Sequence, residues 1–414
     1  MEILGSIVLY IIMACCGIGA VATIVKPDSG LAQSFHDGLG AMASLFLPIV
    51  GLMVSVPYLV VGVEKIFGGL FRSIGADPAI AAAMFIPPDC GGYALFLALA
   101  RSPEIVAIAL IVAITTASTI AFNIPVGLSL LKKEDQPYMA LGAMSGFLSI
   151  PFGAFITCVI MMITQPSIRT SFTTTGPATY VLQLDLLTII INLLPIIAFC
   201  VLLALGLKLF PKAMVKGFMI FGKVLLSVLT LIAAASIIQH YTGVFSNIFG
   251  GWGFDPVLAD SDESFRAIEL LGSIAMMLTG AFPMVYLIRK FFGKGLAKVG
   301  ALVGLDETGS AGLLATMANA VALFNMIKDM KPTNKVICIA FAVCAGYSLG
   351  DWIAFNVNFQ PNLVVPFFIG QFCGGIIGIF FAKVIAVPQV EKMLEQDALS
   401  SKDDPKGINL EEQG

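Results

Sequence analysis

Residues 345–361 read AGYSLGDWIAFNVNFQP and place a carboxylate and several amides within an otherwise apolar region. Residues 336–346 carry no charge, so a helix that starts at Lys335 would carry Asp351 about 24 Å into or across a bilayer. A lone aspartate at the centre of a membrane helix costs about 2.5 to 3.5 kcal/mol. We therefore expect Asp351 to have a function and a specific partner.

The composition is that of a polytopic membrane protein. Hydrophobic residues make up 58% of the 414 residues and charged residues only 12%, and the mean hydropathy is +0.96. A formal charge of -3 without a basic patch argues against a nucleic-acid partner. His36 and His240 lie far apart, so we expect no metal and no cofactor. The eight cysteines lie mostly in apolar runs without a CxxC pair and are interpreted as small buried hydrophobes.

Nine apolar runs are long enough to cross the hydrocarbon core of a bilayer. They cover residues 3–25, 40–63, 104–131, 138–163, 184–210, 214–240, 267–288, 336–356 and 363–387. We interpret the first run as a retained span and not as a cleaved signal, because it lacks a basic start and a small-residue cleavage pattern.

Two further stretches are about as apolar but are interrupted by polar residues, glycines and prolines. Residues 79–100 are broken around Pro87, Pro88 and Asp89, and residues 299–327 around Asp306 and Glu307. We therefore predict an all-α polytopic membrane protein with about nine transmembrane helices and two broken or re-entrant segments.

Basic residues recur at every second loop and mark those loops as cytosolic. They are Lys132, Lys133, Lys208, Lys212, Lys216, Arg289, Lys290, Lys294 and Lys298. Lys328, Lys331 and Lys335 then follow after only one apolar segment, so both ends of residues 299–327 are expected on the cytosolic side. This pattern predicts a re-entrant hairpin, with a complete crossing as the alternative.

The tetrapeptide IAFN occurs at residues 120–123 and again at 353–356, each time after a broken segment that contains an acid. The basic loops orient the two copies in opposite directions, and inverted repeats with discontinuous helices are typical of secondary transporters. We predict a first repeat over residues 1–163, a linking loop and span over 164–212, and a second repeat over 213–387. The polar, acidic residues 388–414 are expected to form a flexible cytosolic tail. For the first two spans, the repeat and the count of basic residues predict opposite orientations.

Several polar residues near the interruptions are candidates for a binding site. Asp89 either caps the helix that begins near Tyr93 or contacts a substrate, since the flanking prolines and glycines expose the backbone. Asp306 and Glu307 precede a helix, which favours capping and leaves substrate contact open. Asn319 is a pore amide or an interhelical hydrogen-bonding group.

The neighbours of Asp351 suit a small organic cation. Trp352 and Tyr347 offer ring faces to an ammonium group, while Asn123 and Asn356 offer amides to a hydroxyl group. The span that holds Asp351 contains no basic residue, which argues against a structural ion pair. We therefore expect a substrate or coupling-ion role for Asp351.

Other functions are open at this level. An intramembrane aspartyl protease would carry Gly-x-Gly-Asp, but Ser348 replaces the first glycine, and we do not expect an enzyme. A proton- or sodium-coupled transporter of another small polar solute and a passive cation channel are the alternatives to a permease.

Several blocks of the sequence resemble the ethanolamine-utilisation permease family, EutH. They are Asp89-Cys90-Gly91-Gly92, residues 124–127 with 138–142, residues 314–319, residues 326–330, and residues 339–344 continued by Gly350-Asp351 and residues 358–361. The resemblance covers most of residues 40 to 387 and is specific in the last block. It departs at Trp352, where the family pattern has a histidine.

The resemblance implies a multi-pass permease of the bacterial inner membrane that imports ethanolamine. The solute would feed a cobalamin-dependent ammonia lyase in bacterial microcompartments, a downstream partner and not a cofactor of this chain. The implied partners are ethanolamine and the lipid bilayer, and a homo-oligomer is left open. Protonated ethanolamine carries one ammonium and one hydroxyl group, which agrees with the carboxylate, aromatic and amide residues above.

Overall fold

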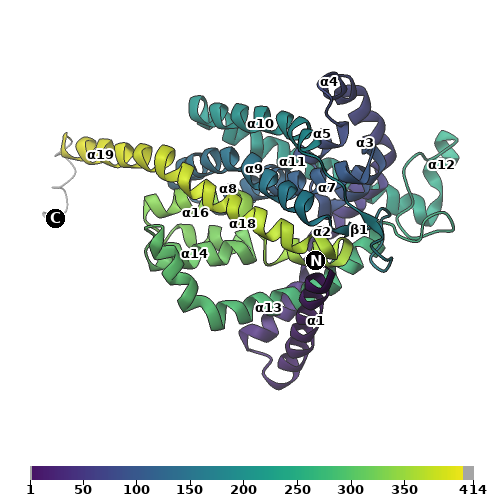
Figure 1. Ribbon diagram of the computed structural model, residues 1–414, viewed down its shortest axis with the longest axis horizontal. Helices are drawn as coiled ribbons and strands as arrows, with labels where there is room; N and C mark the ends of the chain where they lie inside the picture. Colours follow the sequence, from purple (N-terminus) through teal and green to yellow (C-terminus); the bar gives the residue numbers. More distant parts are fainter. Residues whose placement is uncertain (1, 404–414) are drawn as a thin grey trace, which may run out of the picture.

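The computed structural model describes the backbone of residues 2–403, and their side chains except those of residues 2, 293, 294, 296–299, 302 and 397–403. The described chain is almost entirely helical (Figure 1). Within residues 2–403, eight helical stretches are long and apolar enough to cross a membrane, which confirms an all-α polytopic membrane protein. These stretches are Ile3–Val25, Gly30–Val54, Pro103–Leu130, Lys133–Thr164, Leu186–Leu209, Pro211–Thr242, Ala267–Phe292 and Pro361–Gln396.

In the first half of the chain, long helices are interrupted by one pair of short helices and by short 3-10 or π-helical turns, which are labelled η. Its elements are α1 (Glu2–Val25), α2 (Gly30–Val54), α3 (Val56–Val63), η1 (Glu64–Gly68), α4 (Gly69–Ser73), α5 (Pro78–Phe85), η2 (Pro88–Cys90), α6 (Gly92–Leu99), α7 (Pro103–Val112), η3 (Ala113–Ala117), η4 (Thr119–Asn123), α8 (Ile124–Leu130), η5 (Lys133–Asp135) and α9 (Gln136–Thr164).

The second half begins with a small two-stranded antiparallel sheet. Its elements are β1 (Ser167–Ile168), β2 (Tyr180–Val181), α10 (Leu186–Leu209), α11 (Pro211–Thr242), α12 (Val244–Phe249), α13 (Ala267–Leu302), α14 (Glu307–Ala318), α15 (Ala320–Ile327), α16 (Pro332–Ala345), α17 (Asp351–Phe359), η6 (Pro361–Leu363), α18 (Val364–Phe381), η7 (Ala382–Ala386) and α19 (Val387–Asp403).

Two of the nine predicted spans are wrong in their bounds. Residues 336–356 do not form one helix, because α16 ends at Ala345 and α17 begins at Asp351. Residues 40–63 do not form one either: the chain bends at Ser55, whose hydroxyl donates to the Gly51 carbonyl, and Pro57 lies in the first turn of α3. A proline lacks the N–H that would continue the preceding helix. At its other end α2 begins at Gly30, where the Ser29 hydroxyl accepts the Ala32 N–H.

Both broken segments are confirmed. The second one is interrupted where we predicted, at Asp306 between α13 and α14, and once more at Asn319, which we did not predict. The first pair, α5 and α6, is interrupted at Pro87–Gly91, as the prolines and glycines predict. The second pair, α14 and α15, is interrupted at Asn319, where the backbone is extended. At the predicted break, Asp306 precedes α14 and its side-chain carboxylate caps the first turn of that helix.

The interior of the bundle is built around α9, α16 and α18, which pack along one another (Figure 1). α2 packs along α13, and α10 covers α9. In the most apolar stretch of α1 and in that of α11, only 17% of the residues are buried. These helices therefore present apolar side chains to the outside. The inverted repeat predicted over residues 1–163 and 213–387 stays a prediction.

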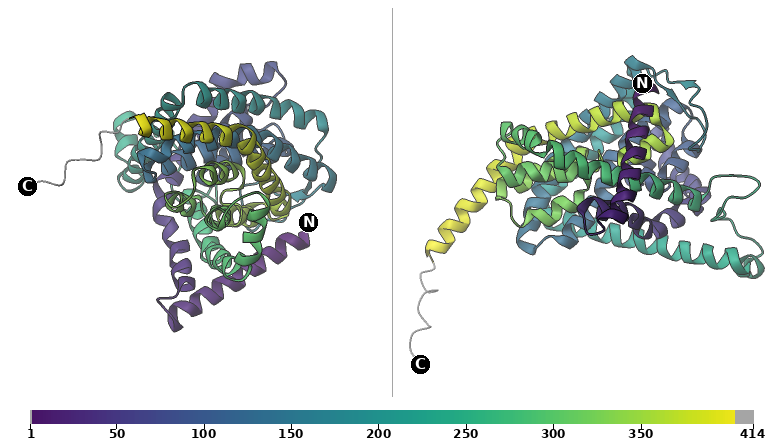
Figure 2. Two further views of the ribbon diagram at one scale, coloured as in Figure 1. Left: turned by 90° about the vertical axis from the view of Figure 1, so that its left-hand side faces the viewer. Right: turned by 90° about the horizontal axis from the view of Figure 1, so that it is seen from below.

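The C-terminal helix α19 continues α18 and projects from the body of the molecule (Figure 2). Residues 388–403, predicted as part of a flexible tail, are helical. Residues 404–414 of that predicted tail lie outside the described residues.

Candidate functional site

We call the short-helix pair α5–α6 the first hairpin and the pair α14–α15 the second hairpin. Asp89 lies in the turn that joins α5 to α6. Pro87 and Pro88 lack the N–H groups that would continue the hydrogen bonding of α5. Gly91 has a φ of 101°, a left-handed conformation that residues with a side chain rarely adopt. The Asp89 Oδ1 atom is buried and has no hydrogen-bond partner among the described residues. The residue that caps α6 is Gly91, without a side-chain cap bond. The alternative role of Asp89 as a helix cap is therefore not seen.

In the second hairpin the polar residues act as caps. Asn319 Oδ1 accepts the Val321 N–H at 2.8 Å and so caps α15. Asp306 Oδ1 accepts the Gly309 N–H at 2.9 Å and so caps α14, and its other oxygen lies 3.5 Å from Lys331 Nζ. Glu307 follows in the first turn and is exposed. α14 separates this end from Asn319 by about 18 Å, so Asp306 and Glu307 are remote from the break of the hairpin.

The interruption between α16 and α17 lies directly against the interruption between α14 and α15. The Tyr347 N–H donates to the Thr316 carbonyl at 2.9 Å, and the Leu349 N–H donates to the Met317 carbonyl at 2.8 Å. Tyr347 has a φ of 59°. Gly350 approaches the Ala318 carbonyl so closely that a Cβ atom would collide with it. These bonds fix Asp351 as the first residue of α17, where the helix dipole stabilises a carboxylate.

The first half reaches the same place through η3 and η4. The Thr119 hydroxyl donates to the Val343 carbonyl of α16 at 3.2 Å. The amide nitrogen of Asn123 lies 3.7 Å from the point that a Cβ on Gly346 would occupy. Asn123 therefore faces the start of the α16–α17 interruption.

We call the polar residues at these interruptions the break cluster, defined as Asp89, Asn123, Thr316, Tyr347, Ser348 and Asp351. The carboxylates of Asp89 and Asp351 interact electrostatically, and Tyr347 interacts with both of them. Four oxygens of the cluster are buried without a hydrogen-bond partner among the described residues: Asp89 Oδ1, Asn123 Oδ1, Thr316 Oγ1 and Ser348 Oγ. Buried polar groups are normally paired, so an interior with several free acceptors is suited to a polar ligand.

Two other predicted residues lie on α17. Asn356 is buried and its Oδ1 has no partner in the described part of the chain. Trp352 is 3% exposed and belongs to the main hydrophobic core. Thr316 and Ser348 were not predicted; their one signal in the sequence is that each stands two or three residues from an interrupted helix end.

One end of the bundle is closed by the loop between α9 and α10. Arg169 of this loop donates through Nη1 to the Asn358 carbonyl at 2.8 Å and to the Phe359 carbonyl at 3.2 Å, and so caps the C-terminus of α17. Gln360 Nε2 donates to the Tyr93 hydroxyl of α6 and to the Arg169 carbonyl. Burial lowers the pKa of Arg169. Arg169 was not predicted; its one signal in the sequence is that it is the single arginine of a threonine-rich loop.

Aromatic rings fill the space beneath this closure. Tyr93 packs edge to face against Phe172 and Phe355, and Phe172 stacks on Phe359 with 5.3 Å between ring centroids. We call Tyr93, Arg169, Phe172, Phe359 and Gln360 the plug. It links the first hairpin, the loop and the C-terminus of α17.

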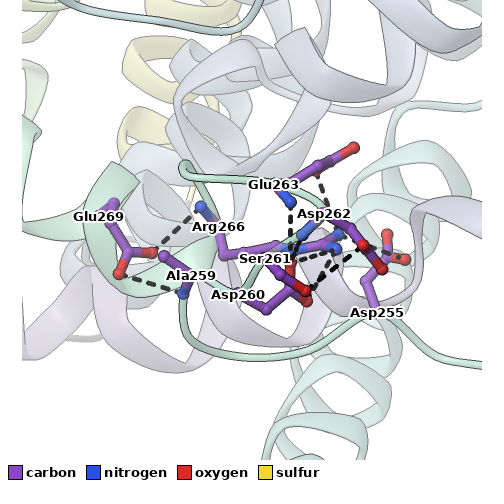
Figure 3. Close-up of polar contacts among 8 residues, drawn as sticks. All are labelled: Asp255, Ala259, Asp260, Ser261, Asp262, Glu263, Arg266 and Glu269. Carbon is purple, nitrogen blue, oxygen red and sulfur yellow. Dashed lines mark hydrogen bonds and ion pairs between the residues drawn. The ribbon is translucent and has the colours of Figure 1, made fainter.

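Beside the plug lies a cavity of about 310 Å³ whose lining includes Phe172, Asp255, Glu263 and Arg266. Arg266 contacts Asp255, Asp260 and Glu263 at 3.1–3.5 Å (Figure 3). Hydrogen bonds from the Glu263 and Asp262 N–H groups, together with Arg266, hold the pKa of Asp260 below its ordinary value. Burial raises the pKa of Asp255, which Arg266 only partly opposes. The acids outnumber the arginine, so the lining of this cavity is electronegative at neutral pH.

The opposite end of the molecule holds a buried ion pair between Lys335 at the start of α16 and Asp135 just before α9. The Lys335 ammonium also lies 5.3 Å from the centre of the Tyr138 ring. This pair joins the two halves of the chain at the end away from the plug.

Comparisons with known proteins agree with the resemblance noted above. Residues 4–385 match the model of the family described as "Ethanolamine utilisation protein, EutH". The chain is 33% identical over 401 residues to the "Probable ethanolamine permease EutH" of Listeria monocytogenes, covering 97% of this chain and 99% of the relative. It is 32% identical to the protein of the same name from Salmonella typhimurium, covering 92% and 95%.

A relative from Bacillus subtilis, "Uncharacterized protein YxeR", is 30% identical over 371 residues, covering 89% of this chain and 91% of the relative. No solved structure matches the chain. The family match spans nearly the whole chain, both hairpins and all the interruptions included. This chain belongs to the EutH family of ethanolamine utilisation proteins.

Proposed function

We propose that this chain is a membrane permease that carries protonated ethanolamine by alternating access, with the break cluster as its binding site. The names of the Listeria and Salmonella relatives support the solute. Discontinuous helices that meet inside a bundle support the mechanism, because their ends leave backbone groups and side chains free for a ligand.

The observation that carries the proposal is the pair of carboxylates in the break cluster. Asp89 and Asp351 interact electrostatically, and no ion pair among the described residues includes either of them. Two carboxylates in a low dielectric repel each other strongly and attract a cation. An ammonium group bound between them replaces repulsion with attraction.

The remaining groups fit the rest of the solute. Tyr347 interacts electrostatically with both carboxylates, and we assign its ring to the ammonium group. The free oxygens of Asn123 and Ser348 can each accept the hydroxyl proton of ethanolamine. Asn356 is a further candidate, and Asn319 can still donate through its Nδ2. We leave Asp306 and Glu307 out of the proposed binding site, because Asp306 caps α14 and Glu307 is exposed in its first turn, both at the far end of that helix.

Each end of the bundle has a closure that suits alternating access. The plug closes the end next to the electronegative cavity, which we place on the outer side because the basic loops predict the other side as cytosolic. The Asp135–Lys335 pair ties the two halves together at the opposite end. Opening one closure while the other holds would expose the break cluster to one side at a time.

A coupled version of the same transport is favoured by the charge count. One ammonium group neutralises one of the two carboxylates and leaves one negative charge in the interior. A proton or a sodium ion would neutralise it and would move together with the solute. A collapse of uptake on adding an uncoupler at constant external pH would support coupling, and unchanged uptake would support a uniporter.

Calorimetric titration of the purified protein with ethanolamine tests the proposal, with propanol and choline as controls. Saturable binding of ethanolamine that is lost in Asp351→Asn would support it, since propanol lacks the ammonium group and choline carries three additional methyl groups. If no amine binds, or if Asp351→Asn binds as well as the original chain, the proposed site is wrong.

A further inference from the structure

A second cavity opens on the side of the bundle, between α2, the first hairpin, η4 with α8, and α11. Its volume is about 380 Å³ and its wall is mostly apolar, with Leu52, Phe122, Val126 and Leu229 among the lining residues. Its inner end is formed by Pro87 and Cys90, on either side of Asp89 in the sequence. We call this cavity the lateral groove.

The mouth of the lateral groove faces the surroundings of a membrane helix. Met219 and Leu226 line it from α11 and are 43% and 51% exposed. α11 is one of the spanning helices, and most of its apolar window is exposed. In a bilayer, the molecules that meet this mouth are lipids.

Lys223 lies at the same mouth, and its positive charge indicates that the occupant is negatively charged. It lines the groove, is exposed, and has no carboxylate within ion-pair distance among the described residues. It is the last charge before the uncharged residues 224–238 of α11, which places its ammonium group at the depth of the lipid headgroups. Leu226 and Leu229 continue along α11 for about 9 Å beyond it, toward the interior of the bilayer.

These features exclude the cationic solute as the natural occupant and select an anionic lipid. An ammonium ion would be repelled by Lys223 and would find apolar walls in place of hydrogen-bonding partners. We infer that the lateral groove binds one anionic phospholipid, with its phosphate on the Lys223 ammonium and an acyl chain along Leu226 and Leu229 toward Pro87 and Cys90. The chain end then lies behind the turn that carries Asp89. The inference does not depend on which solute is transported.

Native mass spectrometry of the full chain in detergent tests it, using phosphatidylglycerol and phosphatidylcholine with identical acyl chains. We expect one saturable phosphatidylglycerol per chain, and phosphatidylcholine binding weaker by about tenfold. Lys223→Gln should reduce phosphatidylglycerol to the level of phosphatidylcholine, whereas Lys223→Arg should retain it. Lys216→Gln is the matched control, because Lys216 lies on the same helix outside the groove.

Three results would overturn the inference. Equal binding of the two lipids to the original chain would show that charge does not select the occupant. An equal loss in Lys216→Gln and Lys223→Gln would show diffuse attraction to a basic helix end. Unchanged lipid binding in Val126→Trp, which fills the groove, would show that the lipid binds elsewhere.

Discussion

Leu349 donates its backbone N–H to the carbonyl of Met317 at 2.8 Å, two residues before Asp351 and two before Asn319. This bond joins the interruption between α16 and α17 to the interruption between α14 and α15. Backbone groups that lack a helical partner at one interruption thus bond to backbone groups at the other. The position of Asp351 is therefore fixed by backbone bonds of the residues before it to a different segment, and not by its own helix alone. A small movement of the second hairpin would therefore move Asp351 directly.

Replacing Asp351 with asparagine should abolish ethanolamine uptake, with a loss of at least about a hundredfold, because an amide offers no charge to the ammonium group. The measurement is uptake of labelled ethanolamine into vesicles that contain equal amounts of folded protein. Asp306→Asn is the matched control, since asparagine is also a good cap and this position lies away from the break cluster. Transport close to normal in Asp351→Asn would refute the assignment.

Replacing Asn123 with alanine should change selectivity more than it changes stability. The free Asn123 oxygen is assigned to the solute hydroxyl, so the variant should bind ethanolamine about tenfold more weakly. Ethylamine has no hydroxyl group and should bind the variant and the original chain alike. Competition of the two amines for uptake measures this ratio, and an equal loss for both amines would remove Asn123 from hydroxyl recognition.

Loss of the plug arginine should open one side of the molecule. Arg169→Ala removes two hydrogen bonds to the carbonyls at the end of α17, at a cost of about 1 to 3 kcal/mol. Cys90, buried in the first hairpin, should then react faster with a membrane-impermeant thiol reagent added from the outside. Peptide mass spectrometry can follow this site, with Cys158 in the buried face of α9 as the internal control. An unchanged Cys90 rate would show that the plug does not close the path.

The buried pair at the other end should be sensitive to the removal of one partner. Lys335→Met alone leaves the Asp135 carboxylate buried and unpaired, and should lower the free energy of unfolding by about 3 to 5 kcal/mol. Adding Asp135→Leu removes that charge and should restore most of the loss. Thermal unfolding in detergent compares the two variants, and equal destabilisation would mean that the pair does not act as a unit.

The acids around Arg266 give a pH dependence with a defined sign. The pKa of Asp260 is lowered in the folded chain by the Glu263 N–H first and then by the Asp262 N–H and Arg266. A lowered pKa stabilises the fold at pH values above the ordinary pKa of 3.8, and this contribution is lost as the pH falls. From about pH 6 to about pH 3, the melting temperature of the original chain should therefore fall more than that of Asp260→Asn. Parallel curves would contradict this assignment.

The sequence predicts those parts of the fold that depend on local chemistry. Prolines and glycines interrupt a helix whatever surrounds it. The break at Pro87–Gly91 could therefore be predicted. The break at Asn319 has little local signal, because one asparagine in an apolar run is compatible with a helix. Its position is fixed by the backbone bonds of Thr316 and Met317 to another segment.

The candidate site was predicted only in part for the same reason. Asp351 and Asp89 stand out because carboxylates are costly in a membrane. Thr316 and Ser348 belong to the site through tertiary contacts, and such hydroxyls occur in many membrane helices without a function. Arg169 acts at the end of α17 from a loop about 190 residues earlier in the chain, a separation that no local pattern reveals.

The two neighbouring π-helical turns η3 and η4 have a consequence for motion. Each π turn of η3 and η4 contains one residue more than α geometry requires. If one turn relaxed into α geometry, everything after it would advance by about 1.5 Å and rotate by about 100°. Asn123 closes the second of these turns, so relaxation of the first turn would rotate this amide about the helix axis relative to Asp351.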